Sequence, residues 1–412
     1  MLNRSNDLRR RPLRGLMTLI CAAFAITACG GGGDAGSTTS GAAATSGSTF
    51  AAGPITGFGS VIVNGVRFDD SNASVTDDDG ASHRSDELRL GMMTEIDSAG
   101  VTTDANGALR SLARAIRFGS EIIGPVTSVA ADGSSLVVLG ETVKINPATL
   151  IDDRLVGGLA ALVPGTSVVE VHGVLDVAAG TYVATRIEPR PNALFFKLRG
   201  VVSNIDKTAH TLRIGSGTET ISYDAIAANV PAALDNGSLV RIRLQTTKVA
   251  GQWVAVTLIS GVRKLDNHDE AELEGTITAS TFATDKKFSV NGIAVDASNA
   301  LFPKGSAGIV LGARVEVKGK AVDGVVIATR VNVETEHERE AAGFELHGAI
   351  SALDATAKTF VLRGITVSFA GTTIEFRKGT VTDLANGKKI EVKGVRSADG
   401  TTLTATRISF ED

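Results

Sequence analysis

Hydrophobic and polar residues alternate in short runs along most of this chain, and glycine-containing turns separate the runs. The clearest example is residues 311–319, where a glycine turn precedes Val-Glu-Val-Lys. In that run Val315 and Val317 share one face, and Glu316 points to the other. Alternation with a period of two residues predicts a β-strand with one buried face. Similar runs recur up to the C-terminus, so the pattern predicts an all-β protein.

A repeat of roughly 70–75 residues organises these runs. In one copy, Val-Glu-Val-Lys-Gly (315–319) is followed by Ala-Thr-Arg-Val (328–331). In the next copy the same positions read Ile-Glu-Val-Lys-Gly (390–394) and Ala-Thr-Arg-Ile (405–408). Three earlier copies are more diverged, and the middle copy departs most. Because the period is far longer than that of a solenoid, we expect each copy to close a small core of its own.

Within residues 271–334 the pattern predicts five short strands. Asn291-Gly292 favours a two-residue hairpin turn between the second and third strands. An irregular stretch at 297–311 separates the third strand from the fourth. This layout is typical of the OB-fold, a small five-stranded barrel. The sequence therefore predicts five tandem small OB-like five-stranded β-barrels, which we call copies 1 to 5, at residues 53–119, 120–191, 193–263, 271–334 and 343–412.

The N-terminus has a different composition. An arginine-rich start precedes an apolar run at 16–28, which is too short for a membrane-spanning helix. The run leads into Ile-Thr-Ala-Cys-Gly, and this pattern resembles a bacterial lipoprotein signal peptide at residues 1–28. The resemblance implies a lipid on Cys29 after cleavage, and Gly30 implies sorting to the outer membrane. An ordinary cleaved signal peptide with a coincidental cysteine is the alternative.

Residues 29–52 consist mainly of Gly, Ser, Thr and Ala, which is the composition of a flexible, disordered tether. Removal of residues 1–28 would leave 36 basic and 44 acidic residues, a net charge of −8. An acidic chain lacks the positive surface that binds phosphate backbones, so we expect no nucleic-acid partner. The expected partners are the membrane, through the N-terminal lipid, and an envelope protein or a glycan.

Candidate chemistry is sparse. The six histidines are scattered without zinc-ligand spacing. We interpret those in the polar linkers, His268 and His337, as solvated rather than as weak cation ligands, and His172 and His347 as surface variants. The Asp-rich stretch at 77–80 lacks the flanking ligands of a calcium loop and predicts a polar turn. We therefore expect no catalytic residue, no metal and no cofactor.

The repeat also predicts a cross-strand ion pair on the outer face of three copies. The expected pairs are Glu170 with Arg186, Glu316 with Arg330, and Glu391 with Arg407. In copy 3 both positions change together, to Arg241 and Thr257, as loss of a cross-strand pair would predict. An exposed pair of this kind contributes at most about 1 kcal/mol. A binding site repeated in each copy is the alternative interpretation.

The opening of copy 1 reads Thr-Gly-Phe-Gly-Ser-Val (56–61) and Val-Asn-Gly-Val-Arg-Phe (63–68). Together with the repeated Val-Glu-Val-x-Gly and Ala-Thr-Arg-Ile strands, it resembles the bacterial DUF5666 lipoprotein family. The resemblance spans about residues 53–412 and implies tandem small β-barrels in the cell envelope. It implies no known activity and transfers no functional residue.

These observations favour a non-catalytic binding or structural module. We expect it to be lipid-anchored to the cell outer membrane and to face the periplasm or the cell exterior. The alternative is a periplasmic capture protein for a glycan or another small ligand, with a groove in copy 1 or copy 3. An enzyme ranks third, because no set of nucleophile, base and orienting residue is visible.

Overall fold

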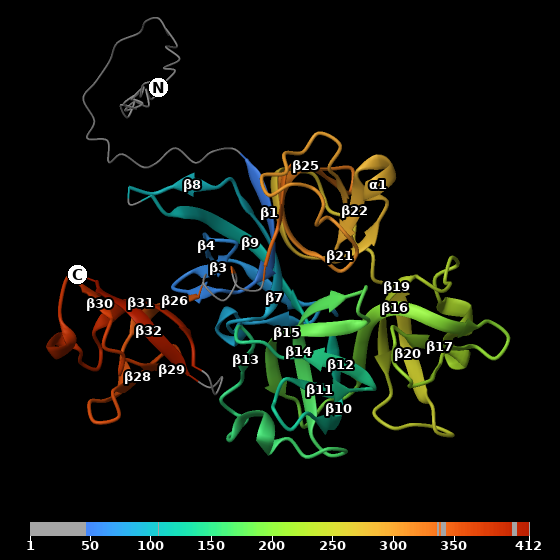
Figure 1. Ribbon diagram of the computed structural model, residues 1–412, viewed down its shortest axis with the longest axis horizontal. Coiled ribbons are helices and arrows are strands. Elements are labelled where there is room, and N and C mark those ends of the chain that lie inside the picture. The colour runs from blue at the N-terminus through green and yellow to red at the C-terminus, as the bar shows by residue number, and fades with distance from the viewer. Residues whose placement is uncertain (1–46, 106, 336–337, 339–342, 398–401, 412) are drawn as a thin grey trace, which may run out of the picture. The chain divides into compact units, whose positions relative to one another are not determined.

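The computed structural model describes residues 47–105, 107–335, 338, 343–397 and 402–411 (Figure 1). The predicted signal peptide, Cys29 and His337 lie outside these residues. The described chain consists mainly of β-strands with one four-residue α-helix, so the all-β prediction is confirmed. Within this part of the chain, no helix is both long and apolar enough to cross a membrane.

The strands close into small barrels, and copy 2 shows the order of pairing most simply. β10 (Ile122–Val129) pairs antiparallel with β11 (Ser135–Val138), and β11 pairs with β12 (Glu141–Lys144). β12 runs parallel to β15 (Thr181–Pro189), which pairs antiparallel with β14 (Val168–Asp176). Because β14 pairs back onto β10, the five strands form a closed circuit. Between β12 and β14 lie β13 (Leu150–Ile151) and the 3-10 helix η2 (Gly158–Ala161).

The strands of copies 3 and 4 pair in the same order. Copy 3 contains β16 (Phe196–Asp206), β17 (Thr211–Ile214), β18 (Ile221–Ser222), η3 (Asp224–Asn229), β19 (Leu239–Leu244) and β20 (Trp253–Ser260). Copy 4 contains β21 (His268–Ser280), α1 (Phe282–Asp285), β22 (Lys287–Val290), β23 (Ile293–Asp296), β24 (Arg314–Val322) and β25 (Val325–Val333). The predicted turn at Asn291-Gly292 is confirmed, since both residues have positive φ and join β22 to β23.

Copies 1 and 5 follow this order with the first strand interrupted. Copy 1 contains β1 (Ser48–Pro54), β2 (Gly57–Phe58), β3 (Val61–Val63), β4 (Val66–Asp69), β5 (Ser74–Asp77), β6 (Ser82–His83), η1 (Ser85–Glu87), β7 (Met93–Ala99), β8 (Thr102–Thr103) and β9 (Leu109–Gly119). Copy 5 contains β26 (Phe344–Ala349), β27 (Ser351–Asp354), β28 (Thr359–Leu362), β29 (Ile365–Ser368), β30 (Glu375–Arg377), η4 (Val381–Asp383), β31 (Lys389–Arg396) and β32 (Leu403–Phe410).

The glycine that ends each Val-x-Val-x-Gly segment has a steric role. Gly173, Gly319 and Gly394 each follow a β-bulge in the fourth strand of their copy. A Cβ at Gly319 would lie 2.2 Å from the carbonyl oxygen of Ile327 on the neighbouring strand. Only glycine allows the two backbones to approach this closely. The bulge therefore recurs with the glycine, and it sets the register of the strands that follow.

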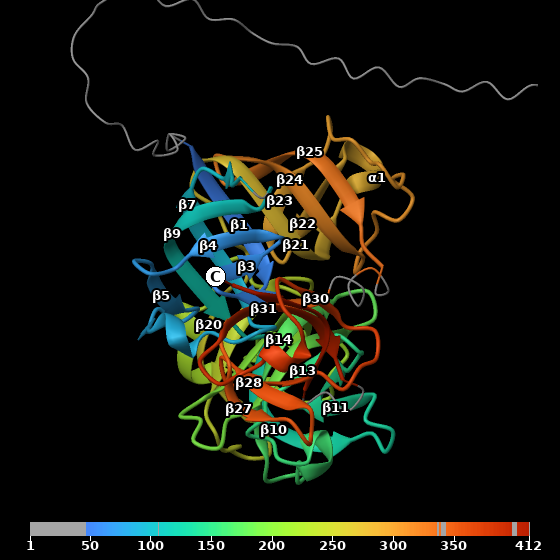
Figure 2. The same ribbon diagram turned by 90° about the vertical axis from the view of Figure 1, so that its left-hand side faces the viewer.

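The predicted tether extends too far into the fold. β1 begins at Ser48, and Phe50, Ala51 and Ala52 are buried in it. β1 pairs antiparallel with β7 of copy 1 and parallel with β21 of copy 4, and it lies beside β21 in both views (Figures 1 and 2). The small residues that resemble a tether in the sequence fit between two flanking strands.

The prediction that each copy closes a core of its own is wrong for copies 1, 2, 3 and 5. One continuous cluster of buried side chains joins copies 2 and 3, and another joins copies 1 and 5. The third cluster belongs to copy 4 and includes Phe50 and Ala52 from β1. Strand pairing also crosses between copies, as β1 with β21, β2 with β26 and β10 with β16. A barrel of about 65 residues buries too little surface by itself, so contact between copies adds burial.

Candidate functional site

The glutamate and arginine of the predicted cross-strand pairs do not contact each other. In copy 4, Glu316 lies opposite Asn332, and Arg330 lies opposite Lys318. Asn332 Nδ2 donates a hydrogen bond to Glu316 Oε2 at 3.0 Å, and Lys318 Nζ lies 3.0 Å from Glu316 Oε1. The predicted pairing of Glu316 with Arg330 is therefore wrong. The bulge before Gly319 shifts the register that the sequence pattern assumed.

The pair predicted in copy 2 is also wrong. Arg186 is buried and binds Asp152 and Glu188, with Nε 2.6 Å from Glu188 Oε1. Glu170 instead lies 3.1 Å from Nε of Arg190. The two predicted partners thus join different ion pairs on the same surface of copy 2.

In copy 5, Arg407 binds Glu375 on β30, with Nε 2.7 Å from Oε2. Glu391 lies opposite Ser409 and close to His347 of the first strand. The prediction of a Glu391–Arg407 pair is therefore wrong as well. In its place, Glu391 belongs to a cluster that faces copy 1.

These residues occupy equivalent positions in their copies, and this shared position explains their contacts better than the predicted cross-strand pairs. The central residue of the fourth strand lies opposite an outward residue of the first strand, as Arg241 lies opposite Arg199 in copy 3 and Glu391 opposite His347 in copy 5. Copies 2 and 4 have Glu170 opposite Ile123 and Glu316 opposite Glu274. In copies 3 and 5 these side chains contact a neighbouring copy. We call this outward pair of positions the docking pair.

Arg241 of the copy 3 docking pair and the nearby Lys197 meet the Asp-rich turn that follows β5 in copy 1. Nζ of Lys197 lies 2.9 Å and 3.1 Å from the two carboxylate oxygens of Asp78, and Nη1 of Arg241 lies 3.2 Å from Oδ2 of Asp78. Arg241 also reaches Asp79 at 3.6 Å. Lys197 is only 2% exposed. Burial alone would raise the pKa of Asp78, but the two cations outweigh it and hold that pKa below its ordinary value.

A second ion pair connects three copies. Arg199 of copy 3 donates to Glu121 Oε1 of copy 2 at 3.0 Å and to the backbone oxygen of Asn291 in copy 4 at 2.6 Å. Burial raises the pKa of Glu121, and Arg199 offsets this only in part. The backbone contact explains why the turn at Asn291 lies against copy 3.

Beside these pairs lies a cavity of about 190 Å³, which residues of copies 1, 2, 3 and 4 line. Glu95 lines it and forms ion pairs with Arg263 and, at 3.6 Å, with Arg117. Burial raises the pKa of Glu95, although Arg263 lowers it. Ser120 lines the same cavity, and within the described chain its hydroxyl has no hydrogen-bond partner.

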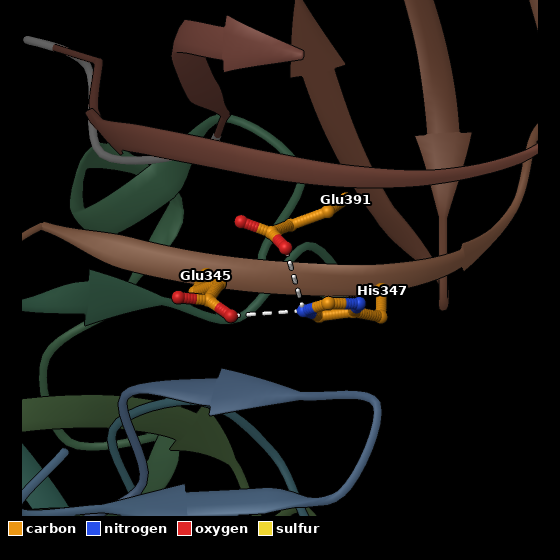
Figure 3. Close-up of side chains that lie close together, drawn as sticks. All are labelled: Glu345, His347 and Glu391. Carbon is orange, nitrogen blue, oxygen red and sulfur yellow. Dashed lines mark hydrogen bonds and ion pairs between the residues drawn. The ribbon is translucent and has the colours of Figure 1, made fainter. Parts of the chain in front are cut away.

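Copies 1 and 5 meet at a cluster of Glu345, His347 and Glu391 (Figure 3). One ligand atom from each lies within 4.8 Å of the others, a spacing that a metal ion requires. Nε2 of His347 lies 2.8 Å from Glu345 Oε1 and 3.5 Å from Glu391 Oε2. These are oxygen and imidazole ligands of the kind that divalent ions bind.

Arg67 of copy 1 already supplies a cation to this cluster. Its Nη1 donates to Nε2 of His347 at 2.7 Å, while Nη2 binds Glu345 and lies 3.8 Å from Glu391. A metal ion would have to displace this guanidinium. Burial would raise the pKa of Glu345, but His347 and the nearby cations lower it to about 2. The cluster therefore fits an ion-pair contact between copies better than a metal centre.

His347 experiences opposing influences in this cluster. Arginine can only donate, so the contact of Arg67 with Nε2 favours the neutral ring. Burial also lowers the pKa of His347, yet Glu345 and Glu411 outweigh both effects and raise it. The interpretation of His172 as a surface variant is wrong, because His172 is fully buried with Nδ1 2.8 Å from the carbonyl oxygen of Gly119. His347 is half-buried in the contact with copy 1.

One feature of the sequence indicated these contacts, but it was interpreted differently. The change from glutamate to Arg241 in copy 3 reverses the charge of the docking pair, and the Asp-rich turn supplies the opposite charge. Reading the two segments together would have indicated a contact between copies 1 and 3. Taken separately, they indicated a lost ion pair and a solvated turn.

The fold and these contacts define a class of protein, a tandem array of small closed β-barrels that dock through charged positions on their outer faces. The chain belongs to the DUF5666 family, a domain of unknown function, whose family model matches residues 123–188, 274–332 and 347–409. The predicted family is thus confirmed through copies 2, 4 and 5, while the expected closest match at residues 56–68 of copy 1 lies outside the matched segments. No curated protein matches the chain.

Proposed function

We propose that this chain is a non-catalytic structural and binding module of the cell envelope, built from five tandem OB-like barrels. The observation that supports it best is the docking of copies through buried ion pairs and shared strands. Lys197 with Asp78, Arg199 with Glu121, and the pairing of β1 with β21 all join different copies. A chain of independent binding domains has no need for such contacts.

The order of strand pairing supports the OB-like assignment. In each copy the third and fifth strands run parallel, as β12 and β15 do in copy 2 and β23 and β25 in copy 4. That order, with a longer excursion between the third and fourth strands, is the layout of a five-stranded OB barrel. The parallel pair closes the barrel and removes exposed edges.

The proposed location depends on Cys29, outside the described residues. We propose that a lipid on Cys29 anchors the chain to the outer membrane, as the resemblance of residues 1–28 to a lipoprotein signal implies. Two or more acyl chains, at about 0.8 kcal/mol per buried methylene, hold a protein stably on a bilayer.

Metabolic labelling with palmitate tests the anchor. The wild-type chain, expressed in a bacterium with an outer membrane, should incorporate label and fractionate with that membrane. The Cys29→Ala variant should lose the label and appear in a soluble fraction, and Cys21→Ala serves as the matched control because Cys21 lies within the proposed signal. Equal labelling of the wild type and Cys29→Ala would rule out the lipid.

Capture of a small ligand is the second candidate. The cavity of about 190 Å³ at the junction of the copies is the observation that favours it. The cavity is smaller than the several hundred Å³ of a site for a drug-sized molecule, so it suits a compact ligand.

A further inference from the structure

A hydroxyl group that forms no hydrogen bond within the described chain lines the cavity between copies. Ser120 is 3% exposed, and its hydroxyl lacks a hydrogen-bond partner within the described chain. A buried hydroxyl without a partner is uncommon in proteins and points to a missing water or ligand. Because Ser120 lines the cavity, that partner would lie inside it.

The charges around the cavity balance. Four arginines line it, and so do four carboxylates. The arginines are Arg117, Arg199, Arg241 and Arg263, and the carboxylates are Asp78, Glu95, Glu121 and Glu274. Each of the eight side chains forms an ion pair with a protein group, so an added charge would find no free counterion. The site therefore suits a ligand without net charge.

The polar groups around the cavity include both hydrogen-bond donors and hydrogen-bond acceptors. Guanidinium groups only donate hydrogen bonds and carboxylates only accept them, whereas Ser120 does either. A ligand whose groups both donate and accept can bond to all three. Hydroxyl groups have this property, and neighbouring hydroxyls match the paired geometry of a guanidinium or a carboxylate.

The remaining wall is apolar. Leu273, Val290 and Ile293 of copy 4 line it, with Met93 of copy 1. Such a surface packs against C–H groups of a ligand. A ring with C–H groups on one face and hydroxyls around its edge satisfies both walls.

We propose that this cavity binds a neutral hexose, either free or as a terminal residue of a glycan. The inference rests on the capture candidate above and assigns its substrate class. It is independent of the lipid anchor, so palmitate labelling and sugar binding can fail separately.

Saturation-transfer NMR on the purified full-length protein tests the proposal. The neutral probes are D-glucose, D-galactose, D-mannose and N-acetyl-D-glucosamine. Two charged probes have the same ring. Glucuronate carries one negative charge, and glucosamine carries one positive charge. We expect saturation transfer to at least one neutral sugar, with both charged rings bound about ten-fold more weakly. Absence of transfer to every neutral sugar, or a preference for a charged ring, would overturn the proposal.

Variants place the sugar in the cavity. Ser120→Leu fills the space and should abolish binding, while Ser120→Ala removes only the hydroxyl and should weaken binding up to about ten-fold. Ser203→Ala is the matched control, because its hydroxyl bonds to the Gly215 carbonyl away from the cavity. Thermal melting of each variant reports folding. If folded Ser120→Leu and Ser120→Ala bind as tightly as the wild type, the cavity is not the site.

Ser260→Phe is a second blocking variant. It places a bulky neutral side chain at an exposed position on the cavity rim, and unchanged sugar binding in this variant would also count against the site.

Discussion

The contact of Asp78 with Lys197 allows the docking of copies to be measured. Substitution of asparagine for Asp78 keeps the shape of the side chain and removes its charge. Lys197 is 2% exposed, so its ammonium would remain buried beside Arg241 without the carboxylate. We expect Asp78→Asn to destabilise the protein strongly, because one uncompensated charge costs more than the loss of a whole pair.

The magnitude follows from the burial of the pair. Removal of one partner from a buried ion pair costs about 3–5 kcal/mol, whereas an exposed pair contributes at most about 1 kcal/mol. The double variant Asp78→Asn/Lys197→Met removes both charges and should be more stable than the sum of the single effects predicts. We expect a coupling free energy of roughly 2 kcal/mol or more.

Urea unfolding gives the measurement. Trp253 is the only tryptophan, it is buried in copy 3, and its fluorescence reports on the copy that contains Lys197. The matched control is the pair of Lys207 with Asp235 in the same copy, whose side chains are 60% and 63% exposed. The control cycle should show no resolvable coupling. If the cycle at Asp78 shows no more coupling than the control, copies 1 and 3 do not dock through this pair.

The same variant has a predictable pH dependence. The lowered pKa of Asp78 contributes stability that is present above its unfolded value of 3.8 and is lost as the pH falls through the folded pKa. Asp78→Asn lacks this contribution, so its stability should depend less on acid than that of the wild type. A parallel acid dependence in both proteins would contradict the assigned cause.

Two further substitutions test other contacts. Burial raises the pKa of Glu141 to about 8, so the folded state retains a proton that the unfolded state loses above pH 4.5. Glu141 should therefore cost the wild type on the order of 3–4 kcal/mol between pH 4.5 and 8. Other carboxylates titrate in both proteins, such as Glu272, whose pKa burial raises to about 7, so urea titrations at pH 5 and 8 should show that Glu141→Gln loses less stability than the wild type by about the Glu141 share; equal slopes would refute the shift. Arg67→Gln removes the guanidinium from the cluster around His347 and should allow zinc to bind there, measured by competition with a coloured chelator. Equal zinc affinity of the wild type and Arg67→Gln would show that Arg67 does not occupy the metal position, and Arg67→Gln/His347→Gln serves as the control that should bind none.

Local structure was predictable because it depends on local sequence. The alternation of Val315, Glu316 and Val317 fixes which face of β24 is buried, and the structure buries both valines. The turn at Asn291-Gly292 needs positive φ at two positions, which those residues tolerate best. These features require no knowledge of neighbouring copies.

The boundary of the first strand was not predictable on the same basis. Apart from Phe50, residues 48–52 are small, and a run of small residues by itself indicates a tether. They form β1 because strands β7 and β21 flank them on both sides. The partner β21 lies more than 200 residues away, so no local pattern indicates the pairing.

The prediction of the register between the fourth and fifth strands failed for a related reason. The repeat shows that Glu316 and Arg330 both point outward, but not how the strands slide past each other. Gly319 follows the bulge that sets this register. A glycine is needed at this position because the backbone of Ile327 approaches closely. Recognition of that glycine as a bulge residue would have placed Glu316 opposite Asn332.

Arg241 shows why divergence within a repeat carries information. From the sequence alone, Arg241 and Thr257 together indicate the loss of a cross-strand ion pair that other copies keep. In the structure, Thr257 lies opposite Arg243, while Arg241 contacts Asp78 and Asp79 of another copy. A residue that reverses charge beside a buried carboxylate is specialised for that contact. The copy that departs most from the repeat is thus the copy that contacts the most neighbours through its docking pair, and its departures mark the surfaces to test first.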